Sequence, residues 1–241
     1  MIIGIKNTIP TLKSVPAWLP SDESRLVAWY RFDEGQTLAD GSAPTNGGLV
    51  SKWEDSSTNT FDMLQTTEAE RPEYSDGALL FTGSESFTSA SAITTLSDGF
   101  VIALRMDANS ANTVILGEST TTSEMIKLHT FSSIRVKPGG SNVDFAMESG
   151  HTTKDDSTWI ITRDSDDEVE VWKNLAGGSL VQQDTAKSGP GDFILDMVGK
   201  RAGGTPNKFV GTVKEIAIFN NIADGNIEEL RNNLLAHLKD L

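Results

Sequence analysis

The chain has 241 residues, 37% of them hydrophobic and 22% charged, so it can bury a core and does not have the composition of a disordered chain. Its formal net charge of −14 disfavours nucleic-acid binding, because the chain and the phosphates would repel each other. It has no cysteine, which excludes disulfides and thiol chemistry. No apolar run approaches the length of a membrane span, so we expect no membrane partner.

Residues 1–21 differ from the rest of the chain and are predicted to form an extended N-terminal arm. Three prolines exclude a long helix or a central strand there. The arm contains Lys6, Lys13 and no acid, a charge of +2, whereas the remaining 18 basic and 34 acidic residues give −16. It could lie across its own domain or dock on a neighbouring subunit, and we favour the neighbour. The residues expected to bind this partner are Ile2, Ile3, Ile5, Lys6, Ile9, Leu12, Lys13 and Trp18.

The start of the arm does not have the pattern of an export signal. Its apolar run is interrupted by Lys6, Asn7 and Pro10 before a hydrophobic region can form. We therefore expect synthesis in a cytoplasm without standard export.

Residues 22–241 are predicted to be a single β domain. Short apolar or alternating runs are separated by turn residues at near-regular spacing, which is typical of a β-sandwich. The segments 71–74 and 33–48 read as connections. The predicted strands are 26–32, 49–53, 61–65, 78–81, 100–106, 113–116, 125–131, 134–137, 143–147, 159–162, 168–172, 180–183 and 193–198.

The C-terminal stretch gives the strongest pattern. Residues 208–220 are apolar on both strand faces, which predicts a central strand that is buried on both sides. The two predicted faces hold Val210, Ile216 and Ile218, and Phe209, Val213, Ala217 and Phe219. A helix is predicted over 222–238, since Ile227, Leu230, Leu234 and Leu238 recur at helical spacing, with Asp224 as its N-cap.

Several of these stretches, in order, resemble the concanavalin A-like lectin/glucanase superfamily in its laminin-G-like form. They are LVAWYRFD (26–33), VSKWEDS (50–56), RPEY (71–74), LLFTG (79–83), WKN (172–174) and FVGTVKEIAIFN (209–220). The resemblance implies an all-β jelly-roll sandwich of two antiparallel sheets. It also implies a context, because such domains occur in bacteriophage structural proteins and in secreted bacterial adhesins. The loop at 56–60 departs from the glycine-rich turn of that family, so it is expected to differ in shape.

The sequence does not favour an enzyme. Glucanases of this superfamily use Glu-x-Asp-x-x-Glu along one strand, and the nearest segment, DSDDEVE (164–170), has the wrong spacing. The three histidines, His129, His151 and His237, have no metal or triad spacing. The acidic turn at 164–168 could bind calcium or could be a solvated hairpin, and we expect the hairpin, with no metal and no cofactor.

Aromatic residues are the other candidates for function, because sugars bind to exposed rings beside amides and acids. Trp29, Trp53 and Trp159 fall where related domains pack their core, and we expect them to be buried. Trp172 alternates with Glu168 and Glu170 and is predicted to lie on a more exposed face. The candidate carbohydrate-binding residues are therefore Trp172 and Tyr74.

These observations favour a non-enzymatic structural protein of a phage virion, in particular a capsid decoration protein. The alternative is a glycan-binding domain of a tail fibre or cell-surface adhesin. The expected partners are other virion subunits, either a major capsid protein or further copies in a homo-oligomer. Glycans are the partner in the alternative.

Overall fold

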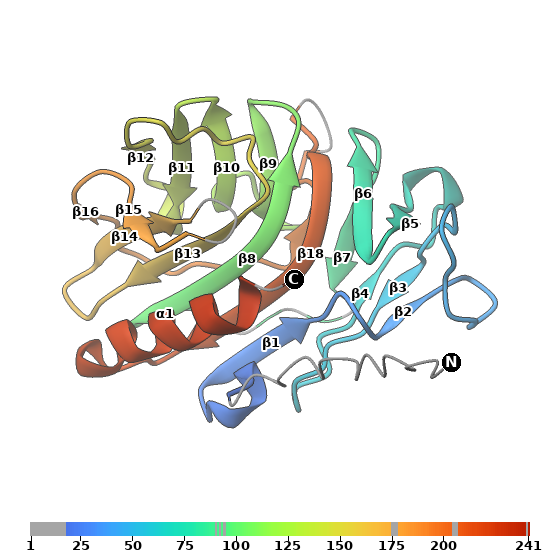
Figure 1. Cartoon of the computed structure of the whole chain (residues 1–241), viewed down its shortest axis with the longest axis horizontal. Helices are drawn as coiled ribbons and strands as arrows, with labels where there is room; N and C mark the ends of the chain where they lie inside the picture. The colour runs from blue at the N-terminus through green and yellow to red at the C-terminus, as the bar shows by residue number, and fades with distance from the viewer. Residues whose placement is uncertain are drawn as a thin grey trace, which may run out of the picture.

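A computed structural model describes residues 18–89, 91, 93, 95–174, 178–203, 207–239 and 241. In this part of the chain, two nine-stranded antiparallel sheets pack face to face, and one α-helix lies outside them (Figure 1). The predicted fold class, a two-sheet antiparallel sandwich with a C-terminal helix, is confirmed. Residues 1–17 of the predicted arm lie outside the described residues.

The first sheet has the order β15-β14-β13-β8-β18-β6-β5, with β1 also paired to β18 and β16 to β14. Its strands are β1 (Leu26–Tyr30), β5 (Glu73–Ser75), β6 (Ala78–Thr82), β8 (Phe100–Ala108), β13 (Ser157–Arg163), β14 (Glu168–Lys173), β15 (Val181–Gln182), β16 (Lys187–Ser188) and β18 (Val210–Asn220). The helix α1 (Asp224–Leu238) follows β18 and covers the outer face of this sheet.

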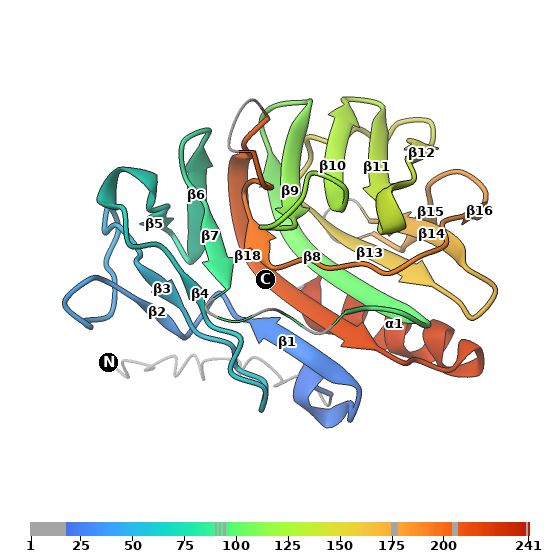
Figure 2. The ribbon, with the colours of Figure 1, turned by 180° about the vertical axis from the view of Figure 1, so that it is seen from behind.

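The second sheet has the order β12-β11-β10-β9-β17-β7-β4-β3-β2 and comes forward when the molecule is seen from behind (Figure 2). Its strands are β2 (Gln36–Thr37), β3 (Lys52–Trp53), β4 (Met63–Leu64), β7 (Phe87–Ser89), β9 (Thr113–Gly117), β10 (Met125–Thr130), β11 (Ser133–Lys137), β12 (Val143–Ala146) and β17 (Met197–Val198). Short 3-10 turns occur at Pro20–Asp22, Glu68–Glu70 and Pro138–Gly140. Four strands, β2, β5, β7 and β16, lie in segments for which the sequence predicted no strand.

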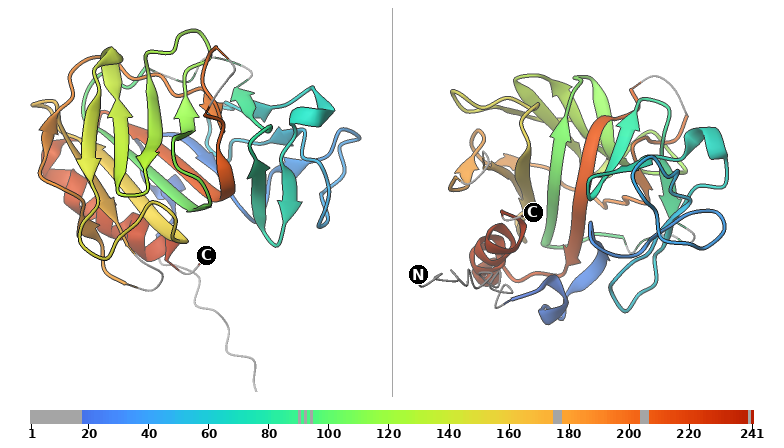
Figure 3. Two further views of the ribbon diagram at one scale, coloured as in Figure 1. Left: turned by 90° about the horizontal axis from the view of Figure 1, so that it is seen from above. Right: turned by 45° about the vertical axis from the view of Figure 1, so that its right-hand side comes forward.

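Two apolar clusters hold these layers together. The main cluster lies between the sheets and encloses Trp53 and Trp159, both with no exposed surface. The second cluster lies between α1 and the first sheet and includes Trp29, which is 2% exposed. The prediction that these three tryptophans are core residues is confirmed. Both views in Figure 3 place the helix outside the sheets, where this second cluster lies.

Strand β18 is central, as predicted, and has β8 on one side and β6 and β1 on the other. Its predicted faces were partly wrong. The pairing with β8 shifts register between Val213 and Glu215, which is a β-bulge. Because the extra residue reverses the alternation, Val213 joins Ile216 and Ile218 in the main core, while Phe219 lies under the helix.

The helix begins at Asp224, but Asp224 is not its N-cap. Ala223 holds that position and makes no side-chain cap. The Asp224 carboxylate instead accepts hydrogen bonds from the Ser165 backbone N–H at 2.9 Å and from the Ser165 hydroxyl at 2.6 Å. These bonds lower the pKa of Asp224 and tie the start of α1 to the β13–β14 turn. Across the described residues, no helix is both long enough and apolar enough to span a membrane.

Candidate functional site

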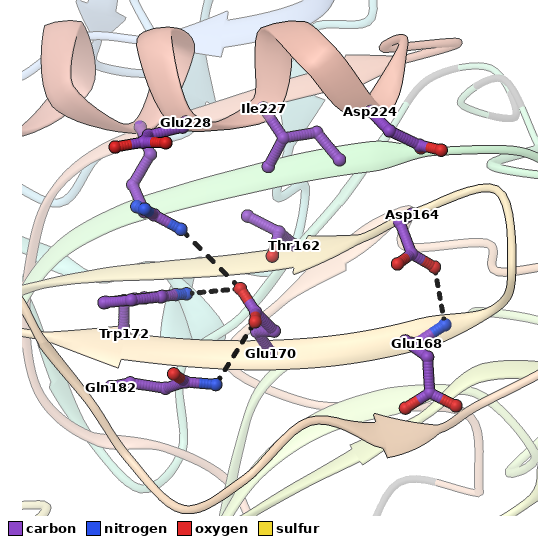
Figure 4. A pocket seen from close by; sticks show the side chains of 10 residues that line it. Thr162, Asp164, Glu168, Glu170, Trp172, Gln182, Asp224, Ile227 and Glu228 are labelled. Atoms are coloured by element: carbon purple, nitrogen blue, oxygen red, sulfur yellow. Dashed lines mark hydrogen bonds and ion pairs between the residues drawn. The ribbon is translucent and has the colours of Figure 1, made fainter.

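A groove of about 360 Å³ runs between α1 and the outer face of the first sheet at its β13–β14–β15 edge. Strand residues form its floor, and one face of the helix forms its wall (Figure 4). Its lining comprises Thr162, Asp164, Glu168, Glu170, Trp172, Gln182, Asp224, Ile227, Glu228 and Arg231. The alternation of β14 explains the floor, because Glu168, Glu170 and Trp172 all point away from the main core.

Glu170 lies at the centre of the groove and is held by two hydrogen-bond donors and one cation, which come from three different elements. Its Oε2 accepts a hydrogen bond from Trp172 Nε1 at 2.9 Å, and its Oε1 accepts one from Gln182 Nε2 at 3.2 Å. Arg231 Nη1 of α1 lies 3.6 Å from Glu170 Oε2. Figure 4 shows these three contacts converging on the carboxylate. The position of Glu170 is therefore fixed before any ligand binds.

Trp172 lies in the groove, but its ring is not a free stacking surface. The Arg231 guanidinium carbon is 3.7 Å from the ring centroid, which is a close cation–π contact. The ring also packs against the cluster under the helix. Trp172 thus lies on the more exposed face of β14, as predicted. Its ring is nevertheless covered by Arg231 of α1, and the sequence gives no sign of this contact.

The charges of the groove are mostly negative. Five of its lining residues are carboxylates, and Arg231 is the one cation among them. Two of the carboxylates already accept hydrogen bonds from the β13–β14 turn. Asp164 Oδ1 accepts the backbone N–H of Glu168 at 2.8 Å, and Asp224 accepts the hydroxyl of Ser165. Neither the Glu168 nor the Glu228 side chain makes an ion pair or hydrogen bond with the described residues. Both are available as acceptors for hydroxyl or ammonium donors.

The turn at 164–168 forms the tight hairpin that the sequence predicts. Asp164 accepts the backbone N–H groups of Asp166 and Glu168, and Asp167 has a φ of 63°. Within the described residues, no group of three or more acidic or histidine side chains is arranged to hold a metal ion. The Asp164 carboxylate thus has a local role in forming the turn.

The other predicted site residues do not join this groove. Tyr74 is half-buried in β5, at the opposite edge of the first sheet from Trp172, and packs against the main core. Trp18 is half-buried and packs against the cluster under the helix, within its own chain. The remaining predicted partner-binding residues, from Ile2 to Lys13, lie outside the described residues. Their contact with a partner stays a prediction.

Sequence reasoning did not find Gln182, Glu228 or Arg231. One signal was available for the helix residues. Ile227 belongs to the apolar stripe, and Arg231 follows it by four residues, so the two share a helix face. Nothing in the sequence indicates that this face borders β14, since that depends on how the helix docks.

A second depression, of about 500 Å³, lies on the outer face of the second sheet near β2, β3 and β4. Its lining has no aromatic residue and no carboxylate, and includes Lys52 and Arg71. It is therefore less suited to a sugar than the groove beside α1.

No protein-family model matches the chain, and a search of curated proteins finds no match. Solved structures do match. A GH54 α-L-arabinofuranosidase aligns at 13% identity with a TM-score of 0.60, covering 88% of this chain and 63% of the enzyme. A Trypanosoma rangeli sialidase aligns at 16% identity with a TM-score of 0.53, covering 94% of this chain and 36% of the sialidase. What they share with this chain is the fold. The chain spans less than two thirds of the length of either enzyme, and the similarity shows a shared β-sandwich fold.

Proposed function

We propose that the protein is a non-enzymatic glycan-binding module whose ligand lies in the groove between α1 and β14. The main observation is the convergence of contacts on Glu170, beside two further carboxylates that have no partner among the described residues, Glu168 on the groove floor and Glu228 on its wall. Sugar hydroxyls are hydrogen-bond donors, and a groove of prepositioned carboxylate acceptors complements them.

The charge of the groove limits the ligand class. Five carboxylates against one guanidinium repel sialylated or sulfated sugars. The preferred glycans are therefore neutral or contain amino groups. Binding, not hydrolysis, is proposed because the strand lacks the three-carboxylate spacing of the glucanases, and because Glu170 is already engaged by two hydrogen bonds and an ion pair within the protein.

A glycan array followed by calorimetry on the best hit tests this proposal. Glu228→Gln keeps the size of the side chain and removes its charge, and should weaken binding about tenfold, the loss expected when a charge-assisted hydrogen bond becomes a neutral one. Glu229→Gln is the matched control, since Glu229 is exposed and does not line the groove. An array without any hit, or equal affinities for Glu228→Gln and the unmodified protein, would refute the assignment.

A second candidate function is a structural role in a phage virion, with the protein as a capsid decoration subunit made in the host cytoplasm. Its support is the resemblance and the charge contrast between residues 1–21 at +2 and the remainder at −16. Trp18 and Leu19 pack on the domain, so an attachment segment would lie ahead of them.

Deleting residues 1–17, and keeping Trp18, tests the attachment role. The truncated protein should remain folded, with an unchanged melting temperature, and should no longer join its assembly. Normal co-sedimentation with virion particles after the deletion would exclude the arm as the attachment device. The two candidate functions are compatible, because a decoration subunit can also bind a glycan.

A further inference from the structure

The outer face of the second sheet has a cluster of cations in a chain that is otherwise strongly acidic. Lys127 of β10 lies directly opposite Arg135 of β11 in the strand register, so both side chains leave the sheet on the same face. The loop after β17 adds Arg201. A Cβ at Gly117 of β9 would lie 2.6 Å from the Arg201 Cβ, so this loop runs close against the sheet next to β10.

Lys127 is the unusual member of this cluster. The residue is 8% exposed, yet its ammonium makes no ion pair and no hydrogen bond with the described residues. Burial lowers the pKa of Lys127, and the neighbouring charges of Arg135 and Arg201 lower it further. The loop residues 204–206, which are not described, are Gly-Thr-Pro and add no carboxylate. The stem of the side chain is buried against the sheet while Nζ still reaches solvent, so the ammonium is only partly hydrated, which is unfavourable where no counter-charge lies beside it and leaves Nζ open to an anion.

The acid that faces this cluster is already paired. Asp144 of β12 holds Arg135 in a two-pronged contact, with Arg135 Nε at 2.6 Å and Nη2 at 2.8 Å from its two oxygens. The hydrogen bonds from Arg135 lower the pKa of Asp144. His129, two residues from Lys127 on the same strand, has a buried Nδ1 that meets no hydrogen-bond partner among the described residues. Three cations and one engaged acid leave this face with an unbalanced positive charge.

We propose that this face binds an oxyanion, a sulfate or carboxylate group, with Lys127 as its central ligand and Arg201 as a second one. The anion is either free in solution or a substituent of an acidic polysaccharide. This site is distinct from the groove, since it lies on the other sheet and has the opposite charge. A bound anion supplies the counter-charge that Lys127 lacks, and its binding energy adds to the free energy of unfolding.

Thermal unfolding in sodium sulfate, compared with sodium chloride of equal ionic strength, tests the proposal. Sulfate should raise the melting temperature of the unmodified protein in a saturable way. Lys127→Met should lose this rise while remaining at least as stable in chloride, because methionine fills the same space without a charge. Lys239→Met removes one cation from the C-cap of α1, which packs on the other sheet, and should keep the sulfate effect.

Equal sulfate effects in Lys127→Met and in the unmodified protein would overturn the proposal. If Lys127→Met does not fold, Arg201→Gln replaces it, and an unchanged sulfate effect in that variant would be equally contrary. Dextran sulfate and neutral dextran separate the two sources of the anion. If dextran sulfate raises the melting temperature at a lower concentration of sulfate groups than sodium sulfate does, the site binds a polysaccharide. If sodium sulfate raises the melting temperature and dextran sulfate does not, the site binds the free ion.

Discussion

Replacing Leu234 by alanine should destabilise the protein strongly, because this side chain has no exposed surface and lies in the cluster that docks α1 on the first sheet. Truncating a buried leucine to alanine loses the free energy gained by transferring its side chain from water to the core, and it leaves a cavity. Together these effects lower the free energy of unfolding by about 2–5 kcal/mol. For a chain of this size, each kcal/mol lowers the melting temperature by about 2–4 °C. A loss of about 3 kcal/mol therefore predicts a fall of about 6–12 °C.

Leu235→Ala is the matched control, since it makes the same chemical change one position along the same helix. Leu235 is only half-buried, and alanine favours the helix slightly more than leucine does. Its cost should be about 1 kcal/mol or less. Urea unfolding followed by circular dichroism measures both variants. Similar losses for Leu234→Ala and Leu235→Ala would refute the docking of α1 through this face, and with it the helix wall of the groove.

Three further predictions concern turns and close contacts. Gly117→Ala should lower the free energy of unfolding by roughly 1–3 kcal/mol, because its Cβ would lie 2.5 Å from a backbone carbonyl oxygen of the 199–203 loop. Gly225→Ala should raise the free energy of unfolding by about 0.4–1 kcal/mol, because a Cβ at Gly225 would meet nothing within 4 Å. The Lys187 ammonium and two backbone N–H groups lower the pKa of Asp184 from 3.8 to about 2. Asp184 thus stabilises the fold above pH 3.8, and the stability difference between Asp184→Asn and the unmodified protein should shrink as the pH falls from 3.8 towards 2, whereas a constant difference would be contrary. A calcium chelator should leave the melting temperature unchanged, because backbone N–H groups already satisfy Asp164, and a fall of several degrees would show that the turn binds a metal.

The sequence by itself determined the fold class. The turn-bounded apolar runs, the two-sided strand at 208–220 and the helical repeat at 227–238 are local patterns that depend on burial and backbone geometry. The burial of Trp29, Trp53 and Trp159 was expected from the family resemblance rather than from these patterns. Strands β2, β5, β7 and β16 were missed because they are two or three residues long and lack apolar alternation, so only their pairing with neighbours makes them strands.

The tertiary structure decided everything that depends on register and docking. A bulge next to Lys214 moved Val213 to the main core, and a one-residue change of phase is not visible in a run that is apolar on both faces. The docking of α1 placed Arg231 on Trp172 and closed the groove around Glu170. The strand register and the 199–203 loop likewise left Lys127 without a counter-charge. Such contacts join residues far apart in the chain, and only packing brings them together.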